Sequence, residues 1–273
     1  MSTPDPLDGR PSPVPTRRRA SGSPVPASAP GSALASPGDD PHRGAVRSRL
    51  LAALAPDDRA ALEPHLEAVA LAVGQVLAEP GEPLAHVYFP ETAIFSVIHR
   101  MADGAAVEVG TVGNEGLVGL AALLEAEASE SQTLAQIPGT AVRLPAAVLV
   151  EAVEARPALR RLLHRYTQAY LTQVAQGAAC NRLHGIEARC ARWLLMTHDR
   201  VGGADVFPLT QEFLAIMLGV RRSGVTLAAG ALQDAGLIRY RRGGIRVLDR
   251  AGLEAAACEC YGAVRRQYDR LLP

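Results

Sequence analysis

The sequence predicts an α+β protein in which a small antiparallel β-barrel or β-roll is joined by a long helix to a helical domain with a β-hairpin. The roll is predicted by short apolar runs between Gly and Pro residues over 69–144, and the long helix by the absence of Gly and Pro from 158 to 176. The helical domain is predicted by residues 209–248, where two helical patterns are followed by a hairpin pattern. At 273 residues, 48% of them hydrophobic, the chain can build one or two domains with cores.

Residues 1–45 are predicted to be a disordered tail. They contain ten prolines and almost no large apolar residues, so they cannot bury enough surface to offset chain entropy. The segment lacks an apolar stretch suited to a signal peptide, and no apolar run in the chain reaches the ~18 to 20 residues that cross a bilayer. A cytoplasmic protein without a membrane partner is therefore expected.

Residues 46–155 are predicted to form one domain of short strands. It begins with two short helices, which are separated by Pro56 and carry Leu50, Leu51, Leu54, Leu62 and Leu66. The apolar residues then change to the spacing of strands, which are expected at 69–73, 87–89, 94–98, 107–112, 134–137 and 142–144. Many short strands at regular spacing favour a small antiparallel barrel or roll.

Residues 156–181 are predicted to form a long amphipathic helix. Pro157 suits the first helical turn, and the apolar stripe behind it consists of Leu159, Leu163, Tyr166, Tyr170 and Val174. Two interpretations follow from the residues alone. The stripe packs on its own domain, or it packs on the same helix of a second subunit.

The net charge of zero conceals a strong division along the chain. Residues 46–155 hold 5 arginines against 15 acidic residues, whereas 156–181 hold 4 against none and 182–273 hold 14 against 9. A polyanion would therefore meet the C-terminal half. All 28 basic residues are arginines. Without lysine, a Walker A loop and a pyridoxal Schiff base cannot form.

The cysteines do not form a recognisable site in the sequence. Cys180, Cys190, Cys258 and Cys260 contain no CxxC pair, so neither a disulfide framework nor a usual zinc site is indicated, and buried or idle thiols are expected. No metal and no cofactor are predicted. The chain has no GxSxG, HExxH or phosphate-loop motif, so it is not expected to be an enzyme.

Residues 209–248 carry the most specific pattern, LTQEFLAIMLGVRRSGVTLAAGALQDAGLIRYRRGGIRVL. Thr210 is a suitable N-cap for a first helix. Gly219 follows Ala215 by four residues and permits a left-handed turn, and Val225 returns an apolar side chain to the core. A small residue at a crossing, a glycine in the turn and a branched anchor are the steric requirements of a helix-turn-helix.

The second helix is expected at 221–234, with its N-terminal end entering the major groove of DNA. Gly236 ends it, and a hairpin with the turn 241–244 forms a basic wing. Arg222 is expected to reach a guanine edge, whereas Arg221, Thr210 and Arg242 hold phosphates. The residues predicted to contact DNA are Thr210, Gln211, Arg221, Arg222, Ser223, Thr226 and Arg242.

With these motifs the chain resembles the Crp/Fnr family of bacterial regulators over roughly residues 46–262. LTQEFLAIMLGVRRSGVT matches that family's helix-turn-helix without a gap, and ARWLL, PGEPLAHVYFPETAIFSVI and VGNEGLVGL resemble its other segments. The resemblance implies a cyclic-nucleotide-binding-like double-stranded β-roll at 46–155 and a winged helix-turn-helix at 182–273. It also implies a dimer through the central helix and effector-controlled promoter binding, and it favours the dimer for the apolar stripe.

Departures from the family concern the effector and the target. Where members that bind cyclic AMP have a Gly-Glu pair, this chain has Gly119 and Leu120, and no arginine, lysine or histidine occurs from 101 to 142. A buried phosphate without a cation is disfavoured, so cyclic nucleotides are not expected. The effector pocket is still assigned to Gly113, Gly119 and Leu120. Ser223 and Leu227 depart from the family's recognition residues, so the target sequence is expected to differ.

The family's metal-based sensors are not expected either. An iron-sulfur sensor is excluded because no cysteine precedes Cys180. Haem is disfavoured because His65, His86 and His99 are scattered singly.

The sequence thus predicts a dimeric, effector-controlled transcription regulator that reads a palindromic promoter site. The expected partners are double-stranded DNA, a second copy of the chain and an unknown small-molecule effector, with RNA polymerase as a further candidate. Two alternatives stay open. The chain is a dimeric interaction or ligand-sensing module that no longer binds DNA, or it is an enzyme or small-molecule-binding protein built on a β-roll.

Overall fold

The computed structural model describes residues 47–202, 206–241 and 243–273. The predicted tail and Arg242 lie outside these residues. Two short helices, α1 (Arg49–Ala52) and α2 (Pro56–Leu62), and the 3-10 helix η1 (Glu63–His65) begin the described chain. Pro56 lies in the first turn of α2, where a backbone N–H would make no hydrogen bond within the helix, so proline is tolerated there. The predicted break between the helices is confirmed.

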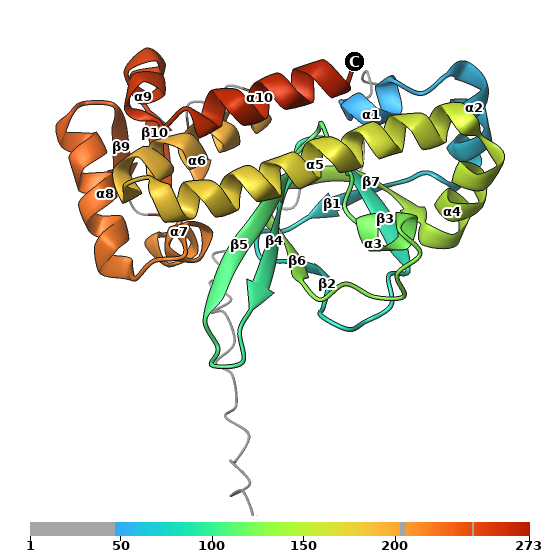
Figure 1. Ribbon diagram of the computed structural model, residues 1–273, viewed down its shortest axis with the longest axis horizontal. Coiled ribbons are helices and arrows are strands. Elements are labelled where there is room, and N and C mark those ends of the chain that lie inside the picture. Colours follow the sequence, from blue (N-terminus) through green and yellow to red (C-terminus); the bar gives the residue numbers. More distant parts are fainter. Residues whose placement is uncertain (1–46, 203–205, 242) are drawn as a thin grey trace, which may run out of the picture. The chain divides into compact units, whose positions relative to one another are not determined.

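The strands of the first domain form two antiparallel sheets, which lie below the long helix α5 in Figure 1. One sheet has the order β1-β7-β3 and the other the order β2-β6-β4-β5. Their bounds are β1 (Glu67–Leu71), β2 (Val76–Ala78), β3 (His86–Pro90), β4 (Ile94–Arg100), β5 (Ala106–Val112), β6 (Gln132–Ile137) and β7 (Gly139–Pro145). The predicted antiparallel roll is confirmed. The short strand β2 was not predicted, because its three residues are too few to show a period.

The interior of the roll is filled by buried apolar side chains from its strands and from the helix that follows them. Val87 and Leu144 are partners in the β3–β7 ladder and are both fully buried. They share a core with Ile94 and Ile98 of β4, and with Leu149 of α4 (Ala146–Ala155). This core holds the roll against the helices that follow it.

The long helix α5 (Pro157–Leu183) packs its predicted apolar stripe on its own chain. Leu159 and Leu163 are each 1% exposed, and the Tyr166 hydroxyl donates a hydrogen bond of 2.9 Å to the carbonyl of Leu117. Tyr170 and Val174 are half-buried. Packing within the chain therefore covers Leu159, Leu163 and Tyr166, whereas Tyr170 and Val174 stay partly exposed.

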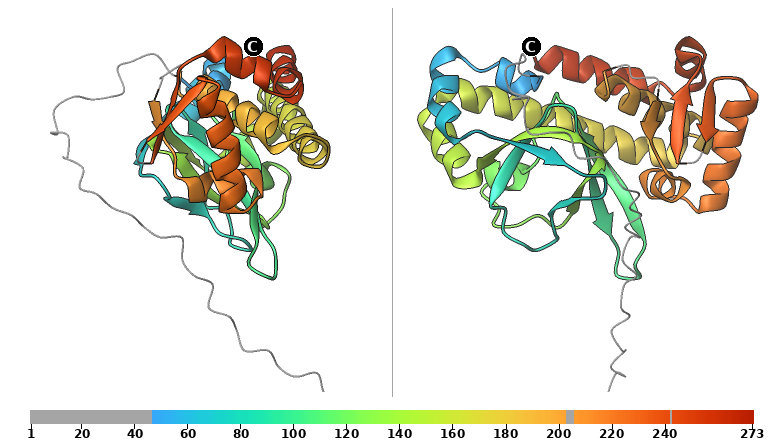
Figure 2. Two further views of the ribbon diagram at one scale, coloured as in Figure 1. Left: turned by 90° about the vertical axis from the view of Figure 1, so that its left-hand side faces the viewer. Right: turned by 180° about the vertical axis from the view of Figure 1, so that it is seen from behind.

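The C-terminal domain begins with α6 (Ile186–Arg200) and contains a three-stranded sheet of order β8-β10-β9. Its further elements are β8 (Val206–Pro208), α7 (Gln211–Leu218), α8 (Arg222–Asp234), β9 (Ile238–Arg241), β10 (Gly244–Val247), α9 (Arg250–Ala256) and α10 (Cys260–Leu271). The predicted hairpin is β9–β10, and β8 adds a strand that the sequence did not reveal. The last helix, α10, lies beside α5 in all three views (Figures 1 and 2).

Of the described helices, none by itself combines the length and apolar character needed to cross a membrane. Only α7 and α8 taken together meet that test, and the chain bends by 100° between them.

Candidate functional site

The pair α7 and α8 has the local geometry of a helix-turn-helix. The Thr210 hydroxyl accepts a 3.1 Å hydrogen bond from the Phe213 amide and caps α7, as predicted. Gly219 takes the left-handed conformation, with φ 61°, and the 100° bend lies within the range of such motifs. Val225 is fully buried, as its predicted role as an anchor requires. The expected motif is therefore present.

The N-terminal end of α8 presents polar side chains to solvent. Arg221, Arg222, Ser223 and Thr226 are exposed. Gln211 is half-buried and lies close by, because its Oε1 accepts a 3.4 Å hydrogen bond from Arg222 Nε. The structure thus brings together the predicted DNA-contacting residues of both helices. Leu227 is 73% exposed on the same helix, which leaves an apolar side chain free for contact.

The wing supplies further exposed arginines. Arg239 and Arg241 lie on β9 and Arg246 lies on β10, and all three are exposed. Tyr240 fixes the hairpin to the start of α7, because its hydroxyl donates a 3.0 Å hydrogen bond to the Leu209 carbonyl. Within the described residues no ion pair neutralises these arginines. The predicted wing residue Arg242 lies outside the described residues.

A cavity of about 310 Å³ lies between the roll and α5. Its lining combines strand residues such as Val97 and Thr133 with Leu120 of α3 (Leu120–Leu123) and Tyr170 of α5. Burial raises the pKa of Tyr170, so its hydroxyl stays neutral. The volume is at the lower end of the range for small-molecule sites.

Two of the three predicted effector residues line this cavity. Gly119 and Leu120 do, whereas Gly113 does not, because it packs against the side chain of Arg200. Gly119 has φ 107°, and a Cβ there would approach Val87, so glycine is required at this start of α3. In the part of the chain that the structure describes, the side chains around the cavity include hydroxyl groups from Ser129, Ser131 and Thr133 but no charged group.

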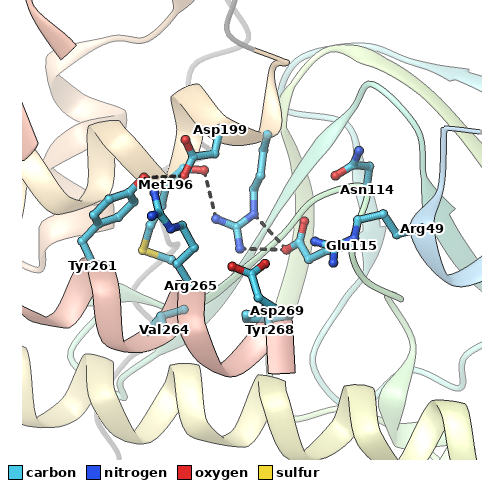
Figure 3. Close-up of a pocket in the computed structure, with 11 residues that line it drawn as sticks. Arg49, Asn114, Glu115, Met196, Asp199, Tyr261, Val264, Arg265, Tyr268 and Asp269 are labelled. Atoms are coloured by element: carbon cyan, nitrogen blue, oxygen red, sulfur yellow. Dashed lines mark hydrogen bonds and ion pairs between the residues drawn. The ribbon is translucent and has the colours of Figure 1, made fainter. Parts of the chain in front are cut away.

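A buried ion pair connects the roll to the C-terminal domain. Arg200 at the end of α6 bonds to Glu115, which lies between β5 and α3, and both side chains are 8% exposed. Arg200 also donates a 3.1 Å hydrogen bond to Gln173 of α5. Figure 3 shows Glu115 beside a pocket of about 130 Å³ that Asp199 and Tyr261 also line. Sequence analysis missed this pair, because the two residues are separated by 85 positions.

A second polar link joins β5 to α6. The Trp193 indole donates a 2.9 Å hydrogen bond to Glu108 Oε1, and the hydroxyls of Ser96 and Thr111 also donate to this carboxylate. Burial raises the pKa of Glu108, although these hydrogen bonds oppose the shift. Sequence patterns give no signal for this contact, because it depends on how α6 packs on the roll.

Three of the four cysteines meet at one place. Cys180, Cys258 and Cys260 lie together with His184, whereas Cys190 is buried elsewhere. Burial raises the pKa of the Cys180 and Cys190 thiols to about 12. The sequence contained a signal, a Cys and a His four residues apart and a C-x-C pair, but Cys180 and Cys258 are 78 positions apart.

Comparisons with known proteins agree with this organisation. A cyclic nucleotide-binding domain matches residues 68–156, and a Crp-like helix-turn-helix domain matches residues 188–256. A comparison with curated proteins finds no match.

Three solved structures illustrate the similarity of the fold. FixK2 from Bradyrhizobium japonicum is 17% identical, with a TM-score of 0.62, and the match covers 71% of this chain and 98% of FixK2. A CRP-family transcriptional regulator from Thermus thermophilus is 22% identical, with a TM-score of 0.59 and coverages of 69% and 96%. The c-di-GMP responsive regulator CLP from Xanthomonas campestris is 15% identical, with a TM-score of 0.58 and coverages of 71% and 99%.

Proposed function

Because the chain belongs to the Crp/Fnr family of transcription regulators, we propose that it binds DNA as a homodimer and that a small molecule in the roll cavity controls this binding. Bound DNA would lie along α8 and the β9–β10 wing. The effector would be neutral, because among the described residues that line the cavity no side chain could pair with a buried phosphate.

The observation that carries the DNA-binding proposal is the uncovered N-terminal end of α8. Arg221 and Arg222 are exposed there, and within the described residues neither makes an ion pair. A phosphate backbone would pair with such arginines and release counterions. Arg222 extends from the end of the helix that enters the major groove in this motif, so it is suited to read a guanine, and Arg221 to hold a phosphate.

A second copy would pack on the exposed face of α5. Its residues His164, Leu171, Ala175 and Ala178 follow each other at helical spacing, and Leu171, which also borders the roll cavity, is 55% exposed. Alanines allow two helices to approach closely, and an exposed leucine gains free energy when a partner covers it. This proposal keeps the predicted homodimer and changes the residues that form its interface.

The cavity and the DNA-binding domain would communicate through the segment 113–121. Leu117, Val118 and Gly119 line the cavity, and Glu115 in the same segment pairs with Arg200 of α6. A ligand that displaces this segment would shift the carboxylate that holds α6. A buried ion pair tolerates little change in geometry, so Arg200 would follow Glu115. The resulting shift of α6 would change the position of the helix-turn-helix.

Selection of genomic fragments from the source organism, followed by fluorescence anisotropy, tests the proposal. We expect the wild-type dimer to bind the selected fragments at least ~10³-fold more tightly than random duplex at physiological salt. The double variant Arg221→Ala and Arg222→Ala should lose this preference. As a control, Arg266→Ala removes an exposed arginine from α10, outside the helix-turn-helix and the wing, and this variant should keep the preference. Equal affinity of the wild type for selected and random duplexes would favour the module that no longer binds DNA.

A further inference from the structure

The side chains of Cys180, His184, Cys258 and Cys260 converge at the end of α5. Cys180 lies in the last turn of that helix, His184 is its C-cap, and Cys260 is the first residue of α10. The three sulfur atoms and the ring nitrogen all lie within 4.8 Å of one another. The three cysteines are buried and His184 is half-buried. Such a set of donors is one that binds Zn²⁺.

The separations between the donor atoms fit a single ion. Cys180 Sγ lies 3.5 Å from Cys258 Sγ, and Cys260 Sγ lies 3.5 Å from His184 Nδ1. Bonds of about 2.3 Å from zinc to sulfur and about 2.0 Å to nitrogen give a tetrahedron with edges of about 3.5 to 3.8 Å. A [4Fe–4S] cluster would hold the sulfurs farther apart, since each cysteine then binds a different iron atom.

The surroundings of the cluster also resemble those of a metal site. His184 Nε2 lies 3.2 Å from Glu259 Oε1, so this carboxylate can hold the ring with Nδ1 directed at the sulfurs. Gln176 donates a hydrogen bond of 3.0 Å to Cys260 Sγ, which would stabilise a thiolate. Three thiolates and Zn²⁺ carry a net charge of about −1, and the positive charges of Arg189 and Arg192 act on Cys180.

We propose that Cys180, His184, Cys258 and Cys260 bind one Zn²⁺ in a closed Cys₃His site that fastens the start of α10 to the end of α5. All four positions are filled by the protein, which is typical of structural rather than catalytic zinc. Each thiol releases its proton to solvent when the metal binds. Since Gly185 follows His184 and joins α5 to α6, the ion would also stiffen the connection to the DNA-binding domain.

Metal titration of the reduced full-length protein tests this site. One equivalent of Co²⁺ per chain should produce the intense visible bands of a tetrahedral thiolate complex, and one equivalent of Zn²⁺ should remove them. Cys258→Ser should lower the affinity by at least ~100-fold, whereas Cys190→Ala removes a buried thiol outside the cluster and should leave one equivalent bound. Zn²⁺ should raise the melting temperature of the wild type and of Cys190→Ala but not of Cys258→Ser.

A milder variant keeps the test informative if Cys258→Ser does not fold. Glu259→Gln leaves all four donors in place, changes an exposed side chain, and should lower the affinity for Zn²⁺ by roughly 10-fold. The proposal is overturned if the reduced wild type yields no tetrahedral thiolate spectrum, or if Cys190→Ala and Cys258→Ser retain the metal equally. A Cys180–Cys258 disulfide that persists under reducing conditions would likewise contradict it.

Discussion

Arg200, the last residue of α6, donates two hydrogen bonds to Oε1 of Glu115, from Nε at 2.9 Å and from Nη2 at 2.7 Å. Glu115 belongs to the segment that borders the roll cavity, and α6 leads into the helix-turn-helix. Two charges are thereby buried together between the two domains. Each charge is compensated by the other, so substitutions in this pair test whether the cavity communicates with the DNA-binding domain.

Arg200→Met should destabilise the protein by ~3–5 kcal/mol, because it leaves the Glu115 carboxylate buried without its partner. Combining it with Glu115→Gln should recover part of this loss, since the remaining groups are neutral. Urea unfolding of both single variants, the double variant and the wild type measures the coupling free energy. A coupling near zero would mean that the ion pair does not hold the domains together.

Stability should also respond to pH through Glu108. Burial raises its pKa in the folded protein above the ordinary value of 4.5, so the ionised carboxylate reduces stability at high pH. This cost diminishes as the pH falls through the folded-state pKa and is gone below 4.5. Glu108→Gln cannot titrate. Its advantage in unfolding free energy over the wild type should therefore be largest near about pH 8 and shrink toward about pH 4.5. A difference that is constant with pH would contradict the shift.

Cyclic AMP and cyclic GMP should not bind in the cavity, because Leu120 cannot accept a ribose hydroxyl and none of the described residues that line the cavity is a cation. Calorimetry should show no binding at micromolar concentrations. The neutral dye N-phenyl-1-naphthylamine should bind instead. Ala121→Trp, which fills the cavity, should abolish dye binding, whereas Ala155→Trp at an exposed site on α4 should not. Micromolar affinity for either nucleotide would show that the binding segment is misplaced.

Substituting arginines on α8 and on the wing should change different properties of DNA binding, namely base discrimination and salt dependence. Arg222→Ala should cost ~1 to 3 kcal/mol of discrimination at one base pair. Arg246→Ala should weaken binding to all DNA sequences about equally. It should also lower the magnitude of the slope of log K against log salt concentration by roughly 0.9, and the same is expected of Arg242→Ala. Anisotropy titrations over a salt series separate the two effects. Unchanged affinity and slope for Arg222→Ala would place recognition in another segment.

Substitutions on the two faces of α5 should separate association from folding. Leu171→Asp and Ala178→Asp alter exposed positions of α5 and should yield folded monomers in sedimentation. Leu163→Asp places a charge at a site that is 1% exposed and should instead destabilise the fold by several kcal/mol. A monomeric wild type at micromolar concentration, or dimers that survive both of the first two changes, would refute this interface.

The sequence by itself determined the features that depend on local periodicity and on special backbone conformations. The short apolar runs that became β3 to β7, Pro56 at the start of α2 and Gly219 in the turn before α8 could all be identified from residue type and spacing. Strand alternation, proline geometry and left-handed glycine are set by neighbours in the chain. The same holds for the exposed arginines of α8, because the positions of Val225 and Leu232 define the opposite, buried face.

Only the tertiary structure decided which partners these elements meet. An apolar stripe on α5 has the same sequence pattern whether it packs within the chain or on a second subunit, and only the structure shows that Leu163 and Tyr166 are buried within the chain. Glu115 and Arg200 carry no signal in the sequence, and neither do Cys180 and Cys258 as a pair, because the contacts between them close long loops. Such contacts arise from how the domains pack, which local patterns do not encode.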